Sequence, residues 1–436
     1  MATSTLPDTD SQTATLTRTA SGRCRFCDSP LEHTFINLGK SPLCESFLAA
    51  EQLNLMEPFY PLHAYVCAEC FLVQLQEYVT GEKIFTEYAY FSSYSDSWLA
   101  HARRYTDKMI GELALSADSQ VIEVASNDGY LLQYFVERGV PSLGIEPAAN
   151  VAKVAIDKGV PTRVEFFGVA LAEELKRGGM QADLLLGNNV LAQVDDINDF
   201  VAGLAIALKP RGVITIEFPH LMQLVEQCQF DTIYHEHFSY FSFVAAERIF
   251  AAHGLVLFDV EELPTHGGSL RIYARHAGDD TKPVNDRALS LRQREVDAGL
   301  LSLDYYASFA RRVEMVKRDL LEFLVDAKRR GRRIVGYGAP GKGNTLLNYC
   351  GIRTDFLEFT VDRSPYKQGK FLPGTEIPIK HPDAIREARP DYVLILPWNL
   401  KDEIAEQLTY VRDWGGRLVV PIPRVEVLPE TSAAPV

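Results

Sequence analysis

The stretch Ser119–Gly139, SQVIEVASNDGYLLQYFVERG, decides the fold of this chain. It reads as a short apolar strand, a turn of small residues and an amphipathic helix. The next apolar segment, PSLGIEP, ends near the acidic residue Glu146, which follows Gly129 by 17 residues. A strand, a glycine-containing turn and an acid after the second strand form the first half of a Rossmann-type nucleotide site. The sequence therefore predicts an α/β domain in which Glu146 accepts hydrogen bonds from ribose hydroxyls.

The turn in this unit, ASNDG, differs from the GxGxxG of dinucleotide sites. In those sites a pyrophosphate lies on the N-terminus of the helix. Asp128 would repel a pyrophosphate there, but it would tolerate a cationic ligand without phosphate, such as S-adenosylmethionine. The departure therefore favours a methyl donor over NAD, and an ordinary βα turn with a helix cap is the alternative.

Two later segments, ADLLLGNNVLAQV and RGVITIEFPH, fit the same sheet. The first begins a strand at Asp183 and ends at Asn188 and Asn189, and the carboxyl end of such a strand is where a doubly wound sheet binds its ligand. The residues expected to bind the methyl donor are Ala125, Asn127, Asp128, Gly129, Glu146, Pro147, Asn188 and Asn189.

A second strand, glycine loop and helix occur in RRIVGYGAPGKGNTLLNYCGI, after a charged stretch of helical spacing from Leu303 to Arg330. Gly336, Gly341 and Lys342 have P-loop spacing, but residue 343 is glycine where magnesium binding needs Ser or Thr. A working NTPase is therefore not expected. Backbone amides and Lys342 suit the diphosphate of a nucleotide sugar, and a loop with only a packing role is the alternative. The loop residues expected to bind substrate are Tyr337, Lys342 and Asn344.

Four of the seven cysteines form two CxxC pairs, Cys24 with Cys27 and Cys67 with Cys70. Two such pairs complete a tetrahedron of thiolates around zinc, and a closed four-thiolate shell leaves no position for water. The gap of 39 residues between the pairs exceeds the usual 15–20. A redox CxxC and four unrelated buried thiols are the alternatives. We predict one structural zinc ion in a small N-terminal module.

The segment FDTIYHEHFSYFS is dense in polar side chains. One interpretation is a metal site with His235 and His237, although no third ligand stands at a recognisable spacing. The second interpretation is acid/base chemistry, with His237 as a general base near neutral pH that a carboxylate such as Glu236 orients. The third is aromatic packing with satisfied histidines.

Two further runs, EYAYFSSYSDSW and THGGSLRIYA, flank this chemistry in the sequence. The first offers hydroxyl donors and stacking faces that suit a sugar or a nucleotide, and the second has a Gly-Gly turn before a strand. Tyr94 and His266 are the residues in these runs that we expect to contact substrate, with an ordinary loop as the alternative for the second run.

In this order, the motifs resemble those of the sugar C-methyltransferases of deoxysugar biosynthesis, which act on nucleotide-linked 4-keto-hexoses, typically dTDP sugars. The resemblance covers about Arg23 to Val425 and rests on the two CxxC pairs, EYAYFSSYSDSW, EVASNDGYLL, GNNVLAQV, YHEHFSYFS, HGGSLR and GYGAPGKGNTLLNY. It implies an α/β fold with a small N-terminal zinc module, a central Rossmann-like class I methyltransferase domain and a C-terminal Rossmann-like domain that helps to hold the sugar nucleotide.

The resemblance also implies roles for individual residues. It makes His237 the base, with Glu236 and Tyr234 beside it, and Tyr88 an active-site tyrosine. Gln193 stands where the family has a histidine in NVLAH. Glutamine can donate a hydrogen bond to an oxyanion but cannot act as a base, so this departure puts the family's two-histidine picture in question.

The expected organisation has six parts. They are a disordered tail (1–20), a zinc-binding domain (21–85), an S-adenosylmethionine-binding methyltransferase domain (86–278), connecting helices (279–331), a C-terminal Rossmann-like domain (332–425) and a second tail (426–436). The expected reaction is methylation of the carbon beside the ketone, C3 before C5, through an enolate. The alternatives are an NAD-dependent nucleotide-sugar oxidoreductase or epimerase and a non-catalytic zinc-containing protein that binds nucleotide sugars.

Composition narrows the class of partner. The chain has 436 residues, 47% of them hydrophobic and 23% charged, with a net charge of −14, which is ordinary globular composition that disfavours a nucleic-acid partner. No run reaches the 18–20 apolar residues of a membrane span, and the N-terminus lacks the apolar core of a secretory signal. We therefore expect a cytoplasmic protein with free or metal-bound thiols, as a monomer or a small homo-oligomer.

Overall fold

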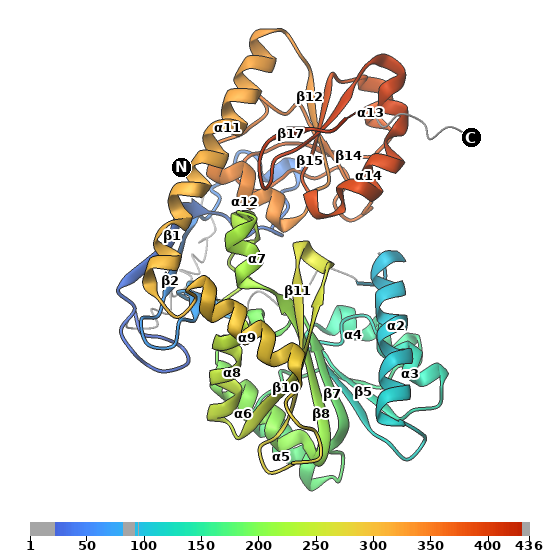
Figure 1. Cartoon of the computed structure of the whole chain (residues 1–436). Helices are drawn as coiled ribbons and strands as arrows, with labels where there is room; N and C mark the ends of the chain where they lie inside the picture. The colour runs from blue at the N-terminus through green and yellow to red at the C-terminus, as the bar shows by residue number, and fades with distance from the viewer. Residues whose placement is uncertain (1–21, 82–91, 95, 430–436) are drawn as a thin grey trace, which may run out of the picture.

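The computed structural model describes residues 22–81, 92–94 and 96–429, which form three β-sheets joined by helices (Figure 1). The tail expected over residues 1–20, the end of the second tail and Tyr88 lie outside the described residues. Within the described ranges, no helix has both the length and the apolar character that a membrane span needs.

The N-terminal sheet has four antiparallel strands in the order β1-β2-β3-β9. Three of them come from the expected zinc-binding domain, and the fourth, β9, comes from far along the chain, where Tyr240 pairs with Val73. No pattern in the sequence indicated this pairing. The pairing of β9 with β3 joins the segment just after His237 to the N-terminal module. The strands are β1 (His33–Ser41), β2 (Tyr60–Val66), β3 (Val73–Leu75) and β9 (Ser239–Tyr240).

The central sheet has the order β10-β11-β8-β7-β4-β5-β6. Its five parallel strands, numbered along the chain, lie in the order 3-2-1-4-5, and β11 is inserted antiparallel between β8 and β10. This is the doubly wound, Rossmann-like arrangement that was predicted. The strands are β4 (Val121–Val124), β5 (Ser142–Ile145), β6 (Thr162–Arg163), β7 (Ala182–Asn188), β8 (Leu208–Pro219), β10 (Leu255–Leu263) and β11 (Ser269–His276).

Helices cover both faces of the central sheet (Figure 1). One face packs against α2 (Asp96–Leu113), α3 (Leu132–Glu137) and α4 (Ala149–Asp157). The other face packs against α5 (Val169–Arg177), α6 (Ile197–Ala207) and α8 (Phe243–Ala252). Because both faces are covered, the inner strands are buried along their whole length, as in VIEV of β4, where all four residues are buried.

The C-terminal sheet repeats this architecture, as predicted, in the order β14-β13-β12-β15-β16-β17. Five strands are parallel and β17 is antiparallel at the edge, so the sheet runs two residues past the expected boundary at 425. Its elements are β12 (Ile334–Tyr337), α12 (Gly341–Cys350), β13 (Thr360–Val361), β14 (Ile379–Lys380), α13 (Ala384–Ala388), β15 (Tyr392–Ile395), α14 (Lys401–Gln407), β16 (Arg417–Val420) and β17 (Glu426–Val427).

Three helices lie between the two Rossmann-like sheets in the chain: α9 (Asp286–Ala298), α10 (Leu303–Ala307) and α11 (Phe309–Arg329). The apolar face of α11 packs into one core that contains side chains of both the N-terminal and the C-terminal sheets. Phe309 at its start stacks on Phe35 of β1, with ring centroids 4.5 Å apart. The first and last domains of the chain therefore share a core, beside the central domain (Figure 1).

Candidate functional site

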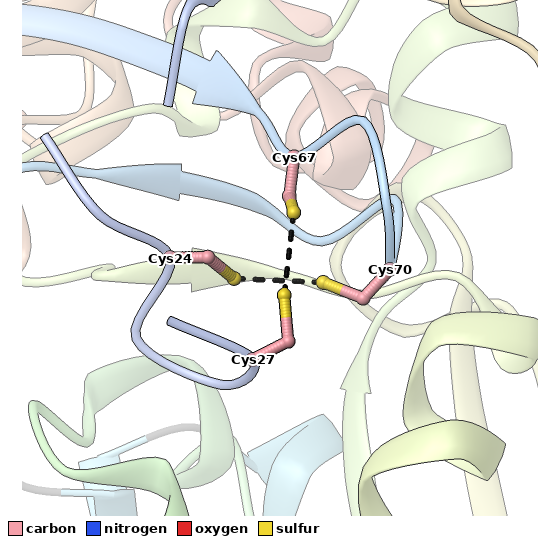
Figure 2. Close-up of side chains that lie close together, drawn as sticks. All are labelled: Cys24, Cys27, Cys67 and Cys70. Atoms are coloured by element: carbon pink, nitrogen blue, oxygen red, sulfur yellow. Dashed lines mark hydrogen bonds between the residues drawn. The ribbon is translucent and has the colours of Figure 1, made fainter. Parts of the chain in front are cut away.

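The four cysteines of the two CxxC pairs converge on one point (Figure 2). Their ligand atoms all lie within 4.8 Å of one another, and the Cys24–Cys70 and Cys27–Cys67 Sγ distances are both 3.5 Å. Zinc–sulfur bonds of 2.3 Å in a tetrahedron place the sulfur atoms about 3.8 Å apart, so this donor set fits zinc. The side-chain amide of Gln74 donates to Cys24 Sγ over 3.2 Å and holds the first pair in place.

A cavity of about 1150 Å³ lies at the carboxyl ends of the central strands. All three parts of the chain line it, including Cys44 and Glu45 of the N-terminal module and Lys342 and Lys367 of the C-terminal domain. Pockets for one small molecule usually have 300–1,000 Å³. The volume therefore suits two ligands that meet inside it.

The turn after β4 forms one side of this cavity. Ala125, Asn127 and Gly129 have φ values of 58°, 50° and 75°, so the backbone folds tightly here. Both carboxylate oxygens of Glu146, after β5, accept backbone N–H groups: Oε2 from Asn127 at 3.0 Å and Oε1 from Ala148 at 2.9 Å. Burial raises the pKa of Glu146, and these two hydrogen bonds oppose the shift. Glu146 thus shapes the turn and also lines the cavity, together with Ala125, Asn127 and Pro147.

Asp128 and Gly129 do not line the cavity. The Asp128 carboxylate pairs with Lys158 at 3.3 Å and accepts the backbone N–H of Ser93 at 3.3 Å. The expected action of its charge on a cationic ligand is therefore not what the structure shows, because Lys158 already balances that charge.

Asn188 and Asn189, after β7, both line the cavity. The Asn188 amide donates to the Tyr130 hydroxyl over 3.1 Å. Asn189 has a φ of 58°, and its Nδ2 lies 3.2 Å from Nε2 of His266. The Oδ1 of Asn189 is buried without a hydrogen-bond partner among the described residues. Such an acceptor fits a ligand that brings its own N–H or O–H groups.

Three lining residues on this side were missed by the sequence analysis: Glu165, Phe166 and Phe167. They follow β6, the strand beside β5, so they continue the cavity wall from Glu146 along the sheet edge. The segment has no recognised motif, and its place after the third parallel strand is the one signal that points to it.

The HEH segment forms a turn, closed by the His237 N–H donating to the Tyr234 carbonyl over 2.9 Å. His235 points away, with Nε2 3.1 Å from the Pro61 carbonyl of β2, whereas Tyr234, Glu236 and His237 line the cavity. The two histidines are therefore directed to different surroundings. Among the described residues, the cysteine cluster is the one group with metal-ligand geometry.

His237 is oriented by a backbone carbonyl and not by Glu236 as expected. Its Nδ1 lies 3.2 Å from the Thr232 oxygen, so Nδ1 carries the proton and Nε2 keeps its lone pair. Burial, with smaller effects from the nearby His266 and Lys342, lowers the pKa of His237 to about 3. The imidazole is therefore neutral at physiological pH, and its pKa lies well below the near-neutral value predicted.

Glu236 lies against Cys44, whose Sγ is 3.4 Å from the carboxyl Oε1. Burial and the neighbouring Glu45 raise the pKa of Glu236 to about 8, so this carboxyl is protonated at neutral pH and can donate a hydrogen bond. Glu45 in turn pairs with Lys367 at 3.4 Å and accepts a hydrogen bond from the Gly341 backbone N–H at the start of α12. No sequence motif pointed to Cys44, Glu45 or Lys367.

Gln193 also lines the cavity, at the end of the short 3-10 helix η3 (Leu191–Gln193). The loop that carries it is bonded to the HEH segment, because the Phe238 N–H donates to the Ala192 carbonyl over 2.7 Å. Gln193 and His237 therefore sit on two adjoining loops that face the same space.

The predicted substrate residues divide into two groups. His266, with a φ of 53°, and Lys342, whose Nζ donates to Asn399 Oδ1 over 2.7 Å, line the cavity. Tyr337 and Asn344 do not, because their side chains donate to Gln407 and to the Cys44 carbonyl. Tyr94 lies in the 3-10 helix η2 (Ser92–Tyr94), and its side chain is outside the described part of the structure, as is Tyr88.

A buried ionic network that the sequence did not reveal supports the His266 loop. Glu217 at the end of β8 accepts from Arg271 at 2.8 Å and from Thr265 at 2.8 Å, and lies 3.0 Å from His101 Nε2. Although burial opposes it, these partners lower the pKa of Glu217 to about 2. The carboxylate therefore remains charged and fixes the residue next to His266.

Comparison with known proteins gives matches along most of the chain. Family models match in three places: a zinc binding domain at residues 24–85, a methyltransferase domain at 98–260 and a C-methyltransferase C-terminal domain at 264–423. The C-methyltransferase NovU of Streptomyces niveus is 34% identical over 409 residues, which are 94% of this chain and 97% of that protein.

Solved structures resemble part of the chain. An S-adenosylmethionine-dependent methyltransferase of Clostridium acetobutylicum is 10% identical, with a TM-score of 0.32, and the match covers 40% of this chain and 91% of that one. The magnesium protoporphyrin IX methyltransferase of Synechocystis is 13% identical, with a TM-score of 0.31 and coverage of 41% and 81%. The CcbJ methyltransferase of Streptomyces caelestis is 14% identical, with a TM-score of 0.31 and coverage of 41% and 90%.

Proposed function

This chain belongs to the C-methyltransferase family, and we propose that its acceptor is the carbon beside the ketone of a nucleotide-linked 4-keto-deoxyhexose, with dTDP as the nucleotide. The chain is an S-adenosylmethionine-dependent C-methyltransferase, and zinc bound by its four-cysteine cluster is its second cofactor. The oxidoreductase and the non-catalytic binding protein considered above are therefore set aside. The observation that carries the proposal is that His237 and Lys342, from different domains, line one cavity.

The wall formed by the strand ends fits S-adenosylmethionine. Glu146 lines the cavity with a carboxylate that can accept ribose hydroxyls, Phe166 and Phe167 offer apolar faces for adenine, and Asn189 Oδ1 lacks a partner among the described residues. When bound, S-adenosylmethionine supplies the methyl group. The remaining proposed contacts come from Ala125, Asn127, Pro147 and Asn188, which lie on the same wall.

The proposed base is Nε2 of His237. A ketone acidifies the C–H bonds of the neighbouring carbon, and the neutral imidazole has a lone pair available to accept that proton. The low pKa of the buried ring opposes this step in the free protein. A bound diphosphate and the developing enolate both bring negative charge close to the ring, and negative charge raises the pKa of an imidazole. Substrate binding would thus convert a weak base into an effective one.

The enolate oxygen needs hydrogen-bond donors. Gln193, Tyr234 and the protonated carboxyl of Glu236 line the same cavity as His237, and each donor of this kind is worth about 2.7–4 kcal/mol in the transition state. We extend the proposal to Tyr88, whose position lies outside the described residues. Zinc does not act as a Lewis acid here, because four thiolates fill its coordination shell.

The diphosphate is proposed to lie near Lys342 and Lys367. Both ammonium groups belong to the C-terminal domain and line the cavity. The N-terminus of α12 already donates the Gly341 N–H to Glu45, so the lysine side chains, and not the helix amides, supply most of the attraction. His266 on the opposite wall completes the proposed substrate site.

The test is a turnover assay with a methyl-labelled donor and a panel of nucleotide-linked 4-keto sugars. We expect mass spectrometry to show one added methyl group and NMR to place it on C3 or C5. Methyl transfer to oxygen or nitrogen alone, or no transfer to any keto sugar, would contradict the proposal.

The base is tested by His237→Asn, with His235→Asn as its control. Both substitutions alter the same turn, but His235 faces Pro61 and His237 faces the cavity. We expect His237→Asn to abolish both deuterium exchange at the α-carbon and methyl transfer while S-adenosylhomocysteine still binds in calorimetry. Exchange at the wild-type rate in His237→Asn would rule out His237 as the base.

A further inference from the structure

The first zinc knuckle, Cys24–Cys27, contains a side chain that leaves the metal site and reaches the catalytic loops. Arg25 stands between the two ligands of this knuckle. Its NH1 group donates to the Asp195 carbonyl over 2.8 Å, and its NH2 group donates to the Leu75 carbonyl over 2.6 Å. The guanidinium also lies over the ring of Phe238, 5.3 Å from the centroid.

Two of these three contacts, those to Asp195 and Phe238, belong to segments that form the cavity wall. Asp195 lines the cavity two residues after Gln193. Phe238 directly follows His237, and its own backbone links the two sides: its N–H donates to Ala192 over 2.7 Å and its carbonyl accepts from Leu75 over 2.9 Å. The guanidinium therefore lies where the loop of Gln193, the loop of His237 and β3 meet.

The backbone of the knuckle also makes hydrogen bonds to the central domain and to β3. The Asn198 side chain, on α6, donates to the carbonyls of Arg25 and Phe26 at 3.2 and 3.0 Å. The Arg25 backbone N–H donates to Gln74 Oε1 over 2.9 Å, and Gln74 in turn donates to Cys24 Sγ. The backbone of Arg25 is thus fixed by the metal site and by α6, and a fixed backbone gives the long side chain a defined reach.

We propose that Arg25 is a positioning residue that uses the zinc knuckle as a rigid base to set the spacing between Gln193 and His237. Arginine suits this task because its planar guanidinium donates to two carbonyls at fixed angles and stacks on an aromatic ring at the same time. Zinc then contributes to catalysis at a distance, by holding the knuckle from which Arg25 extends. The inference rests on the proposed roles of Gln193 and His237, but its test is separable from theirs.

The test compares Arg25→Gln and Arg25→Lys with Arg23→Gln, in the full-length, zinc-loaded protein. Arg23 is the matched control, because it is a cation beside the same knuckle whose partner is the exposed Asp28. We expect all three variants to hold one zinc by metal analysis and to bind S-adenosylhomocysteine within about twofold of the wild type. We expect kcat to fall about 10- to 100-fold in Arg25→Gln and to stay unchanged in Arg23→Gln. The fall should be smaller in Arg25→Lys, because lysine keeps one donating nitrogen in place of the two that arginine uses.

A second measurement separates positioning from folding. A residue that only stabilised the fold would lower the melting temperature and leave kcat per folded molecule intact. Wild-type kcat in zinc-loaded Arg25→Gln would overturn the proposal. Loss of zinc in both Arg25 variants would also overturn it, because Arg25 would then serve the metal site alone. If the wild type itself shows no methyl transfer to keto sugars, the proposed function fails and not this inference, which is then tested with whichever acceptor proves active.

Discussion

At the scale of single residues, the active site depends on protonation states that burial creates. Glu236 is protonated at neutral pH because burial and Glu45 raise its pKa to about 8, whereas His237 is neutral because burial lowers its pKa to about 3. Burial thus keeps both groups uncharged, a carboxyl that would be ionised in water at this pH and an imidazole that would be partly protonated. A neutral acid and a neutral base are what enolate chemistry needs, since one donates to the oxygen while the other takes the proton.

The raised pKa of Glu236 predicts how stability depends on pH. Between the unfolded value near 4.5 and about 8, the folded chain keeps a proton that the unfolded chain has lost, so stability falls as the pH rises through this range. Glu236→Gln has no such proton to lose. We expect this variant to gain about 1–3 kcal/mol relative to the wild type between pH 5 and pH 8, measured by denaturant unfolding. An equal difference at both pH values would contradict the protonated state.

At the scale of elements, the glycine turn after β10 controls how closely the C-terminal domain approaches the central domain. Gly267 has a φ of 89°, and a Cβ built there would lie 2.6 Å from the Trp398 ring. Trp398 is fixed from the other side by its Nε1, which donates to Asp231 over 2.7 Å. The turn therefore brings His266 and Lys342 together across the domain boundary.

Gly267→Ala is predicted to disturb this boundary, with Gly254→Ala as its control. Gly254 has a similar φ of 72°, but nothing lies within 4 Å of its Cβ position. Both variants suffer backbone strain of about 1 kcal/mol, and Gly267→Ala adds an overpacking cost of about 1–3 kcal/mol. We expect the KM for the sugar nucleotide to rise only in Gly267→Ala, measured by steady-state kinetics. An equal KM in the two variants would show that the contact with Trp398 does not matter for binding.

The elements also show what the sequence could predict. The two Rossmann-like sheets were predictable because strand, turn and helix follow one another locally, and the zinc site was predictable from four cysteines. The pairing of Tyr240 with Val73 was not, because a two-residue strand leaves no periodicity and its partner is distant in the chain. His237 was found by its chemistry and Gln193 through the family resemblance, whereas Thr232 as the orienting group depends on a turn that only the folded chain reveals.

At the scale of the whole molecule, the N-terminal and C-terminal domains share one hydrophobic core, which contains Phe35, Phe309 and the apolar face of α11. One core of the central domain also contains Cys24, Leu31, Cys67, Cys70 and Leu72 of the N-terminal module, whereas the core on the other face of the sheet contains, among the described residues, central-domain side chains alone. The N-terminal module therefore packs against both of the other domains, and all three parts of the chain line the cavity.

Phe309→Ala tests the core that the N-terminal and C-terminal domains share, with Phe250→Ala as its control. Both phenylalanines are fully buried, the first in the shared core and the second beneath the central sheet. Each truncation is expected to cost about 3–5 kcal/mol. We expect Phe309→Ala to speed hydrogen exchange in both the N-terminal and the C-terminal sheets, and Phe250→Ala to speed it in the central sheet. Loss of protection in only one terminal sheet after Phe309→Ala would contradict a shared core.

The shared core also limits the order in which the domains can fold while the chain is synthesised on the ribosome. The N-terminal sheet emerges first, yet its fourth strand is completed only when Ser239–Tyr240 have been synthesised, and β1 packs against α10, α11 and α12, which follow still later in the chain. Domains usually fold as units as they leave the ribosome, the first one earliest. Here the first domain must wait for the last, and zinc captured by the cysteines is the interaction that can hold the nascent N-terminal module together during that interval.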